Sequence, residues 1–307
     1  MITANETYIQ LDASTTLRDI CFVNDSIVFV CGGSPGKNGT IWQSKDGGRV
    51  FNRILDVPQR CIYDIDFGNN NNGYAGGDDV LLLHTTDGGL TWKNEFENHD
   101  FSEWQEFITP IRKVRALGIQ WVVAVGGDTY YKGIMCNTWN WGQNWTFRNY
   151  DNQLNDMVMP GGSYARICGY GRMFASTDTC RTLHDLDVPN DHFTGIDFYD
   201  NNHGIACGYN GGIYLTTDGG TSWKTALEPN GSTGSRKHLN DVTFTPSHNA
   251  VVVGANGLIL YSSDGGTSWA TVEHDVTDDL FCVHAVSDTE FLYCGAGGRL
   301  YRINLMN

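Results

Sequence analysis

The chain has 307 residues and a formal net charge of −15, and this acidic balance disfavours general binding to nucleic acids or to anionic membranes, which are themselves polyanionic. No apolar run approaches the roughly 18 residues that a membrane-spanning helix needs, so we expect no membrane insertion. Thirty-seven glycines, 12% aromatic residues and only seven prolines are typical of many short strands joined by tight turns.

The first residues of the chain do not resemble a secretion signal. Residues 1–5 have neither a charged segment nor an apolar one. Two interpretations remain, a cytoplasmic protein or an exported (periplasmic or extracellular) protein whose leader is absent from this chain, and we favour the exported one. The next residues, Thr7–Leu11, alternate like a strand but lack neighbouring strands of their own.

A short motif of the form Ser/Thr-x-Asp-x-Gly-x-x-aromatic then repeats along the chain. Four copies are clear and two are altered, and their central residues are Asp46, Asp87, Asn140, Asp178, Asp218 and Asp264. The spacings of 41, 53, 38, 40 and 46 residues match the length of one four-stranded propeller blade. We call this motif the Asp box.

A second landmark precedes each box, an apolar strand that ends in glycine. There are seven such strands, ending at Gly32, Gly76, Gly126, Gly169, Gly208, Gly254 and Gly295. The last copy runs through Arg299–Ile303 and stops where its box and fourth strand should follow. The strand at Thr7–Leu11 can supply that missing strand and so remove a free sheet edge. The sequence therefore predicts an all-β, seven-bladed β-propeller of four-stranded antiparallel blades, a single domain over residues 1–307 whose N-terminal strand completes the last blade.

The Asp boxes have a mechanical interpretation. The carboxylate can accept backbone N–H groups across a hairpin turn, glycines supply positive φ, and the closing aromatic residue packs as an apolar wedge. A carboxylate, glycine and tryptophan together could also suggest a metal or sugar site. Because the motif returns in nearly every blade, we interpret all six boxes as structural.

Nine cysteines are an odd number, so at least one is outside any intramolecular disulfide. Four of them share one repeat position, where other blades have alanine or valine, and are predicted to be reduced core thiols: Cys31, Cys168, Cys207 and Cys294. Cys21, Cys61 and Cys282 fall on innermost strands and are expected to behave likewise. The roles of Cys136 and Cys180 stay open.

The repeated boxes resemble those of the Asp-box (BNR) propellers, and the segment from Asn72 to Trp92 resembles the photosystem II stability/assembly factor-like branch of that group. The resemblance covers essentially the whole chain. It is specific for the fold and weak for function, because related propellers include sialidases, xyloglucanases, sortilin-type receptors and assembly factors. It implies that the boxes lie between the third and fourth strands, opposite the functional face.

That functional face would consist of the loops that lead into each innermost strand and the loops between the second and third strands. Ten of the twenty Lys and Arg residues fall in these loops, which predicts a basic surface that binds an acidic peptide or carboxylate. The residues predicted to bind a partner are Arg18, Arg60, Tyr63, Arg112, Lys113, Arg172, His192, Tyr209, Arg236 and His238. The alternative is that exposed loops simply carry charges, and nearby acids such as Asp78 would partly neutralise the surface.

Two functions remain open at this stage. We favour a non-enzymatic propeller that binds a protein or peptide, and the alternative is a carbohydrate-active or carbohydrate-binding propeller such as a glycoside hydrolase or sialidase. No catalytic residue, cofactor or metal site is predicted, because nucleophile elbows, phosphate loops and HExxH motifs are absent and the histidines show no ligand spacing. A long loop, Glu95–Pro110, carries Phe101 and Trp104 as further candidates for a partner surface. The sequence does not indicate the oligomeric state.

Overall fold

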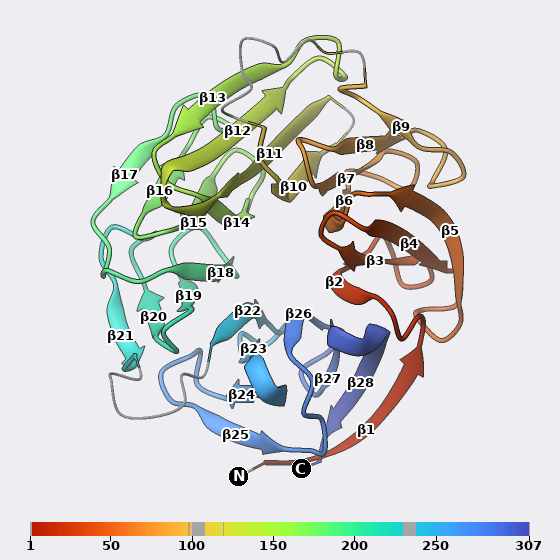
Figure 1. Cartoon of the computed structure of the whole chain (residues 1–307). Helices are drawn as coiled ribbons and strands as arrows, with labels where there is room; N and C mark the ends of the chain where they lie inside the picture. Colours follow the sequence, from red (N-terminus) through yellow and green to blue (C-terminus); the bar gives the residue numbers. More distant parts are fainter. Residues whose placement is uncertain (1, 98, 100–107, 119, 230–237, 307) are drawn as a thin grey trace. The chain divides into compact units, whose positions relative to one another are not determined.

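The computed structural model describes residues 2–97, 99, 108–118, 120–229 and 238–306. These residues contain no α-helix, and their strands form five four-stranded antiparallel sheets and one eight-stranded sheet, in which the N-terminal strand joins the last two four-stranded blades (Figure 1). The prediction of an all-β fold with seven propeller blades is confirmed. The chain divides into two compact units, which we call unit A (residues 18–156) and unit B (residues 1–17 and 157–307). The prediction of one single domain stays a prediction.

Blades 1 to 3 make up unit A, apart from the first two residues of β2. Their strands are β2 (Thr16–Phe22), β3 (Val28–Ser34), β4 (Asn38–Ser44), β5 (Phe51–Pro58), β6 (Ile62–Phe67), β7 (Gly73–Gly77), β8 (Leu82–Thr85), β9 (Lys93–Asn94), β10 (Ile111–Leu117), β11 (Trp121–Asp128), β12 (Lys132–Thr138) and β13 (Thr146–Tyr150). A 3-10 turn, η2 (Thr129–Tyr131), joins β11 to β12. The innermost strand of one blade packs against the preceding blade, since β6 contacts the second strand β3 and β10 contacts both β6 and β7.

Blades 4 to 7 make up unit B, apart from the first three residues of β14. Their strands are β14 (Leu154–Val158), β15 (Ala165–Gly169), β16 (Met173–Ser176), β17 (His184–Leu186), β18 (Phe193–Phe198), β19 (Gly204–Gly208), β20 (Ile213–Thr216), β21 (Lys224–Leu227), β22 (Leu239–Phe244), β23 (Ala250–Gly254), β24 (Ile259–Ser262), β25 (Ala270–Glu273), β26 (Leu280–Ala285), β27 (Glu290–Gly295) and β28 (Arg299–Leu305). Two 3-10 turns, η3 (Ala255–Gly257) and η4 (Ala296–Gly298), join second strands to third strands.

The N-terminal strand β1 (Ile2–Gln10) is the fourth strand of blade 7, as predicted. It pairs antiparallel with β28 from Ala4–Leu305 to Gln10–Arg299. Its first residues also pair in parallel with β25 of blade 6, which the sequence did not predict. The Tyr293 hydroxyl donates a hydrogen bond to the Glu6 carboxylate, so a side chain as well as the backbone holds β1 in place.

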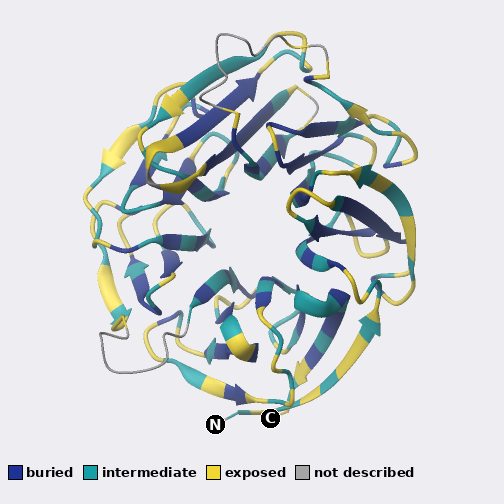
Figure 2. Cartoon of the chain, viewed as in Figure 1, coloured by how far each residue is buried: buried dark blue, intermediate teal, exposed yellow. Residues whose placement is uncertain are grey.

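Burial follows strand position within each blade. The glycine-ended second strands are almost fully buried, whereas outermost strands such as β17 and β21 are largely exposed (Figure 2). Cys31, Cys168, Cys207 and Cys294 lie in second strands, are fully buried and are free thiols, as predicted. Cys136 is fully buried too, and burial raises the pKa of its thiol to about 12. It is therefore a neutral core side chain at ordinary pH.

Each Asp box forms the turn between the third and fourth strands of its blade. In blade 2, Asp87 accepts hydrogen bonds from the Thr85 hydroxyl (2.8 Å) and from the backbone and hydroxyl of Thr91 (2.9 and 2.6 Å). The Thr85 hydroxyl oxygen accepts the Gly89 N–H at 2.9 Å, and the Trp92 indole donates to the Gly89 carbonyl. These bonds lower the pKa of Asp87 to about 2, the Thr91 side chain contributing most. The polar groups of the turn are thus satisfied within it.

Candidate functional site

The innermost strands share an irregularity at their second residue. In five blades the pairing register to the second strand shifts at this point, and the extra residues are Tyr63, Arg112, Thr194, Asn240 and Phe281. Such a β-bulge turns a side chain away from the regular alternation of the strand. It lies at the end of the blade opposite the Asp box, because the first strand begins where the second strand ends. The bulge residues are chemically different in every blade.

Two predicted residues, Tyr63 and Arg112, are bulge residues, and Arg18 holds the equivalent position in β2, directly after the buried Leu17. Arg18, Arg112 and Lys113 were predicted to lie in loops, but they lie in strands. The reason is that each strand already begins at or before the preceding buried apolar residue, Leu17 in β2 and Ile111 in β10.

Arg18, Tyr63 and Arg112 come together in unit A, and we call them the Arg–Tyr–Arg cluster. The guanidinium carbons of Arg18 and Arg112 lie 5.6 and 5.3 Å from the centre of the Tyr63 ring, within the range of cation–π attraction. The Tyr63 hydroxyl donates to Asp78 Oδ1 at 2.9 Å, and Asp78 Oδ2 accepts the backbone N–H of Cys61 at 2.8 Å. Arg18, Tyr63 and Arg112 are half-buried, whereas Asp78 and Cys61 are buried.

The cluster is held rigidly and remains cationic. The Arg112 Nε donates to the Gly127 carbonyl at 3.0 Å, so one edge of this guanidinium is fixed. Burial lowers the pKa of Arg112, but arginine does not lose its proton in proteins. Burial raises the pKa of Tyr63 well above its usual value, so the phenol stays neutral and a hydrogen-bond donor. The two guanidinium groups face the Asp78 carboxylate, and the charge of Asp128 also acts on Arg112.

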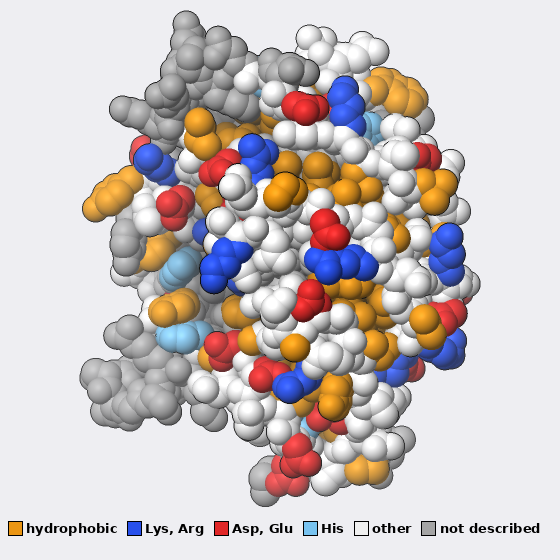
Figure 3. Space-filling model, turned by 45° about the vertical axis from the view of Figure 1, so that its right-hand side comes forward, with side chains coloured by type: hydrophobic (Ala, Val, Ile, Leu, Met, Phe, Trp, Pro, Cys, Tyr) orange, Lys and Arg blue, Asp and Glu red, His pale blue; other side chains and the backbone are white. Residues whose placement is uncertain are grey.

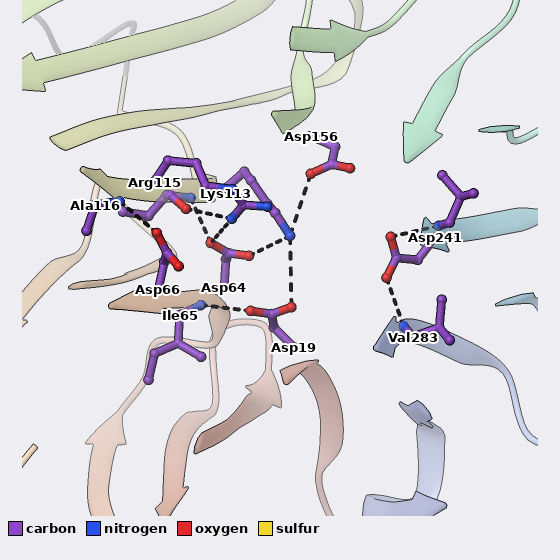
Figure 4. Close-up of polar contacts among 12 residues, drawn as sticks. Asp19, Asp64, Ile65, Asp66, Lys113, Arg115, Ala116, Asp156, Asp241 and Val283 are labelled. Carbon is purple, nitrogen blue, oxygen red and sulfur yellow. Dashed lines mark hydrogen bonds and ion pairs between the residues drawn. The ribbon is translucent and has the colours of Figure 1, made fainter. Parts of the chain in front are cut away.

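Lys113 follows Arg112 but is in a different environment. Its Nζ lies 2.8 Å from Asp64, 3.6 Å from Asp156 and 3.9 Å from Asp19, and its side chain is 16% exposed (Figure 4). These carboxylates compensate its charge. Among the residues predicted to bind a partner, Lys113 is therefore one whose charge is already engaged inside the protein.

The carboxylates around Lys113 belong to a repeated contact between blades. Asp19 accepts the Ile65 N–H of the next blade at 3.1 Å, and Asp64 accepts the Val114 N–H at 2.7 Å. In unit B, Asp241 accepts the Val283 N–H at 2.8 Å in the same way (Figure 4). Lys113 occupies in β10 the position that aspartate holds in these strands. Burial, followed by the charge of Asp64, raises the pKa of Asp19 well above its usual value.

In unit B, four rings from three successive blades form a row, which we call the Tyr–His row. Ring centres are 4.9 Å apart for Tyr170 and His192, 5.7 Å for His192 and Tyr209, and 3.6 Å for Tyr209 and His238. The His238 Nδ1–H donates to the Tyr209 carbonyl at 2.6 Å, which fixes the tautomer of the neutral ring. Three of these residues were predicted.

Tyr170 and the carboxylate beneath the row, Asp191, were not predicted. The buried Asp191 accepts the Tyr214 hydroxyl at 2.9 Å and the Asn210 amide at 2.8 Å. Tyr170 follows Gly169 as Tyr209 follows Gly208, so alignment of the glycine-ended strands could have revealed it.

The remaining predicted residues are dispersed. Arg60 lies half-buried between β5 and β6. Arg172 pairs with Asp185 at 2.9 Å, and its guanidinium carbon is 5.3 Å from the centre of the Phe174 ring. Arg236, its neighbour Lys237, and the aromatic residues Phe101 and Trp104 lie outside the described residues.

Within the described part of the chain, no group of three or more His, Cys, Asp or Glu side chains is placed to hold a metal ion. A search of the same residues finds no helix with the length and apolarity needed to cross a bilayer.

Comparison with known proteins places this geometry in context. The family model for the photosynthesis system II assembly factor YCF48 matches residues 173–277. A curated relative, the photosystem II assembly lipoprotein Ycf48 of Synechococcus sp. (strain CC9902), is 28% identical over 182 residues, which are 57% of this chain and 50% of the relative. The aligned part of the chain thus spans about half the length of the curated relative it matches.

The chain is an Asp-box propeller that resembles the photosystem II assembly factors. A solved structure of YCF48 bound to D1 peptide covers all of both chains, with a TM-score of 0.76 and 20% identity. YCF48 from Cyanidioschyzon merolae covers 97% of this chain and 98% of its own, with a TM-score of 0.75 and 16% identity. The WD40 β-propeller domain of Doa1 covers 96% and 95%, with a TM-score of 0.71 and 13% identity. These likenesses establish the propeller fold.

Proposed function

We propose that this protein is a non-enzymatic, exported propeller of the assembly-factor or scaffold type, which binds a peptide segment of a partner protein at the end of the blades opposite the Asp boxes. The Arg–Tyr–Arg cluster carries this proposal. Two guanidinium groups held beside a neutral phenol favour a carboxylate of the peptide, because guanidinium binds carboxylates through paired hydrogen bonds. The solved YCF48 structure with D1 peptide supports a peptide ligand, and the lipoprotein relative supports export.

The carbohydrate-active alternative is not favoured. Glycoside hydrolysis uses two carboxyl groups, one on each side of the scissile bond. In unit A the inward carboxylates Asp19 and Asp64 instead accept backbone N–H groups and pair with Lys113. Hydrolysis of aryl glycosides by the purified protein at a rate above that of buffer would contradict the non-enzymatic proposal.

The binding proposal can be tested with a fluorescently labelled D1 peptide and fluorescence anisotropy. Arg18→Gln together with Arg112→Gln should weaken binding by about tenfold or more, since two charge-assisted contacts are lost. The matched control is Lys45→Gln with Arg49→Gln, which removes two exposed cations from the Asp-box turn of blade 1. That control should bind like the wild type.

Equal weakening of peptide binding in both double variants would indicate an effect of net charge alone. It would contradict the Arg–Tyr–Arg cluster as the binding site. The other predicted residues, Arg60, Arg172, His192, Tyr209, Arg236 and His238, are proposed as further contacts. Each can be changed singly in the same assay, with Tyr170→Leu added for the Tyr–His row. An unchanged affinity removes that residue from the proposed site.

A further inference from the structure

The box turn of blade 3 departs from the repeat. Its sequence, Thr138–Trp145, has tryptophan at two positions, 139 and 141, where the other turns have Lys, Thr, Ser or Gly. Both side chains are about half exposed, 44% for Trp139 and 49% for Trp141. Single hydrophobic side chains also reach the surface between charged ones elsewhere (Figure 3), which is ordinary for a globular protein. Two exposed tryptophans in one turn are unusual for such a surface.

The turn does not need these tryptophans in order to fold. Asn140 accepts the Thr138 hydroxyl at 2.9 Å and the Asn144 N–H at 3.0 Å, so the amide reproduces the bonds of the usual aspartate. Trp141 has φ +66°, at a position that is glycine in four other boxes. A bulky residue in the left-handed region is strained, by roughly 1–3 kcal/mol. Glycine would meet the local requirement better, so the reason for Trp141 lies outside the turn.

The same turn has lost its charge. Asn replaces the box aspartate, and no residue from Thr138 to Trp145 is charged. The nearest carboxylate on blade 2, Glu95, is 11% exposed and hydrogen-bonded to His84 at 3.0 Å. An aspartate at position 140 would have to lose water if the turn entered a less polar medium, whereas the amide avoids most of that penalty. The blade 3 turn therefore differs from the other box turns in two respects at once, because it carries no charge and it exposes two indole rings.

The neighbouring box turns of unit A carry exposed apolar side chains at their tips as well. Val50 in blade 1 is 60% exposed and Leu90 in blade 2 is 74% exposed. The Gln43 side chain of blade 1 donates to the Gly88 carbonyl in the blade 2 turn, so these turns are side by side. The box turns of unit B have no large hydrophobic residue that is exposed among the described positions.

We propose that the Thr138–Trp145 turn is a peripheral membrane contact that places Trp139 and Trp141 in the headgroup region of a lipid bilayer. Indole rings favour this region because one edge is polar and the body is apolar. The exposed area of these two side chains also favours lipid over a protein partner. Two half-exposed tryptophans offer on the order of 200 Å², well below the roughly 800 Å² per partner of a stable protein interface. The site is independent of the proposed peptide site, at the other end of the blade.

The test is flotation of the full chain with phosphatidylcholine vesicles, with and without added phosphatidylglycerol. Wild type should float with the vesicles. The double variant Trp139→Thr with Trp141→Gly, which restores residues found in other boxes, should partition about tenfold or more weakly. Tyr131→Ser is the matched control, because Tyr131 is 78% exposed but lies in η2 at the opposite end of blade 3, and it should float like the wild type.

Three results would overturn the proposal. In the first, the wild-type protein stays in the lipid-free fraction with both vesicle types. In the second, the double variant floats like the wild type. In the third, the wild type self-associates without vesicles and the double variant does not. Thermal unfolding and D1-peptide affinity of the double variant should match or exceed those of wild type, so a folding defect is distinguishable from lost lipid contact. Failure of flotation would leave the peptide-binding proposal unaffected.

Discussion

The box turns and the innermost strands use aspartate in opposite ways. At the box turns, Asp87 and Asp178 are half-buried carboxylates surrounded by donors of their own turn, and these donors lower both pKa values to about 2. At the innermost strands, Asp19 is buried and Asp66 half-buried, each accepts a backbone N–H of the next blade, and burial raises their pKa values. The box chemistry returns nearly unchanged from blade to blade, whereas the bulge residues differ in every blade. The comparison teaches that the repeated end builds the fold and the variable end is free to carry specificity.

The largest effect should come from the innermost strands, at Lys113. Changing Lys113→Met removes the nearest cation from Asp19, Asp64 and Asp156 and leaves Arg115, 3.9 Å from Asp64, as the remaining one, and should lower the free energy of unfolding by about 3–5 kcal/mol. Urea unfolding at pH 7 measures this. Lys45→Met, at an exposed box position, should stay within about 0.5 kcal/mol of the wild type. Adding Asp64→Asn to Lys113→Met should restore part of the loss, and no restoration would contradict the pairing.

At the box end, equivalent changes in different blades should have equal effects. Thr85→Val and Thr216→Val each remove a hydroxyl that donates to the box aspartate and accepts a glycine N–H. Each should lower the free energy of unfolding by about 1–2 kcal/mol, and the double variant should show the sum, because the sites lie in separate blades. A difference of more than about 1 kcal/mol between the two variants would show that the boxes are not interchangeable.

The two kinds of aspartate should also respond to pH with opposite sign. Stabilisation by Asp87 is complete above its ordinary pKa near 3.8 and disappears as the pH falls toward 2, because its folded-state pKa is lowered. Asp19 has a raised folded-state pKa, so its contribution to stability decreases as the pH rises above about 3.8.

Unfolding by urea between pH 3 and pH 8 separates these two cases. The free energy of unfolding of Asp87→Asn should approach that of the wild type only at the lowest pH values. The free energy of unfolding of Asp19→Asn should increase relative to that of the wild type as the pH rises. Parallel curves for the two variants would contradict the assignment of opposite environments.

The smallest predicted effect concerns the altered box of blade 4. Thr179 and Cys180 have φ of 61° and 59° where the four clear boxes have glycine. Thr179→Gly should raise the free energy of unfolding by about 1 kcal/mol, because it relieves a β-branched residue in the left-handed region. Thr177→Gly, in the same turn but without positive φ, should lower it by roughly 0.5–1 kcal/mol. Differential scanning calorimetry of both variants would show the contrast, and a loss of stability in both would refute the strain.

The sequence predicted the blades well because the same pattern recurs along the chain and each copy supports the interpretation of the others. The seven glycine-ended strands all became second strands, and the strand at Thr7–Leu11 was recognised because the last blade lacked one. The functional end was harder to predict. Its bulges have no sequence pattern of their own, since the bulge residues include the cation Arg112, the amide Asn240 and the apolar Phe281.

Contacts that join neighbouring blades were missed for the same physical reason. The partners of Lys113 are Asp19, Asp64 and Asp156, each from another innermost strand, and only the packing of those strands shows that one lysine meets three carboxylates. Likewise, the Tyr–His row depends on how loops of successive blades lie against each other. Side-chain type placed His192 and His238 among the candidates, but the stacking between rings is a property of the fold.

The pairing of β1 with β28 and β25 has a consequence for how the protein is made. β1 is synthesised almost 290 residues before the first residue of β28, and at typical elongation rates this delay is tens of seconds. During that time the strand has no antiparallel partner, while blades 1 to 6 can fold in order behind it. Pairing of β1 with β28 is therefore a long-range step that cannot take place before β28 has been synthesised.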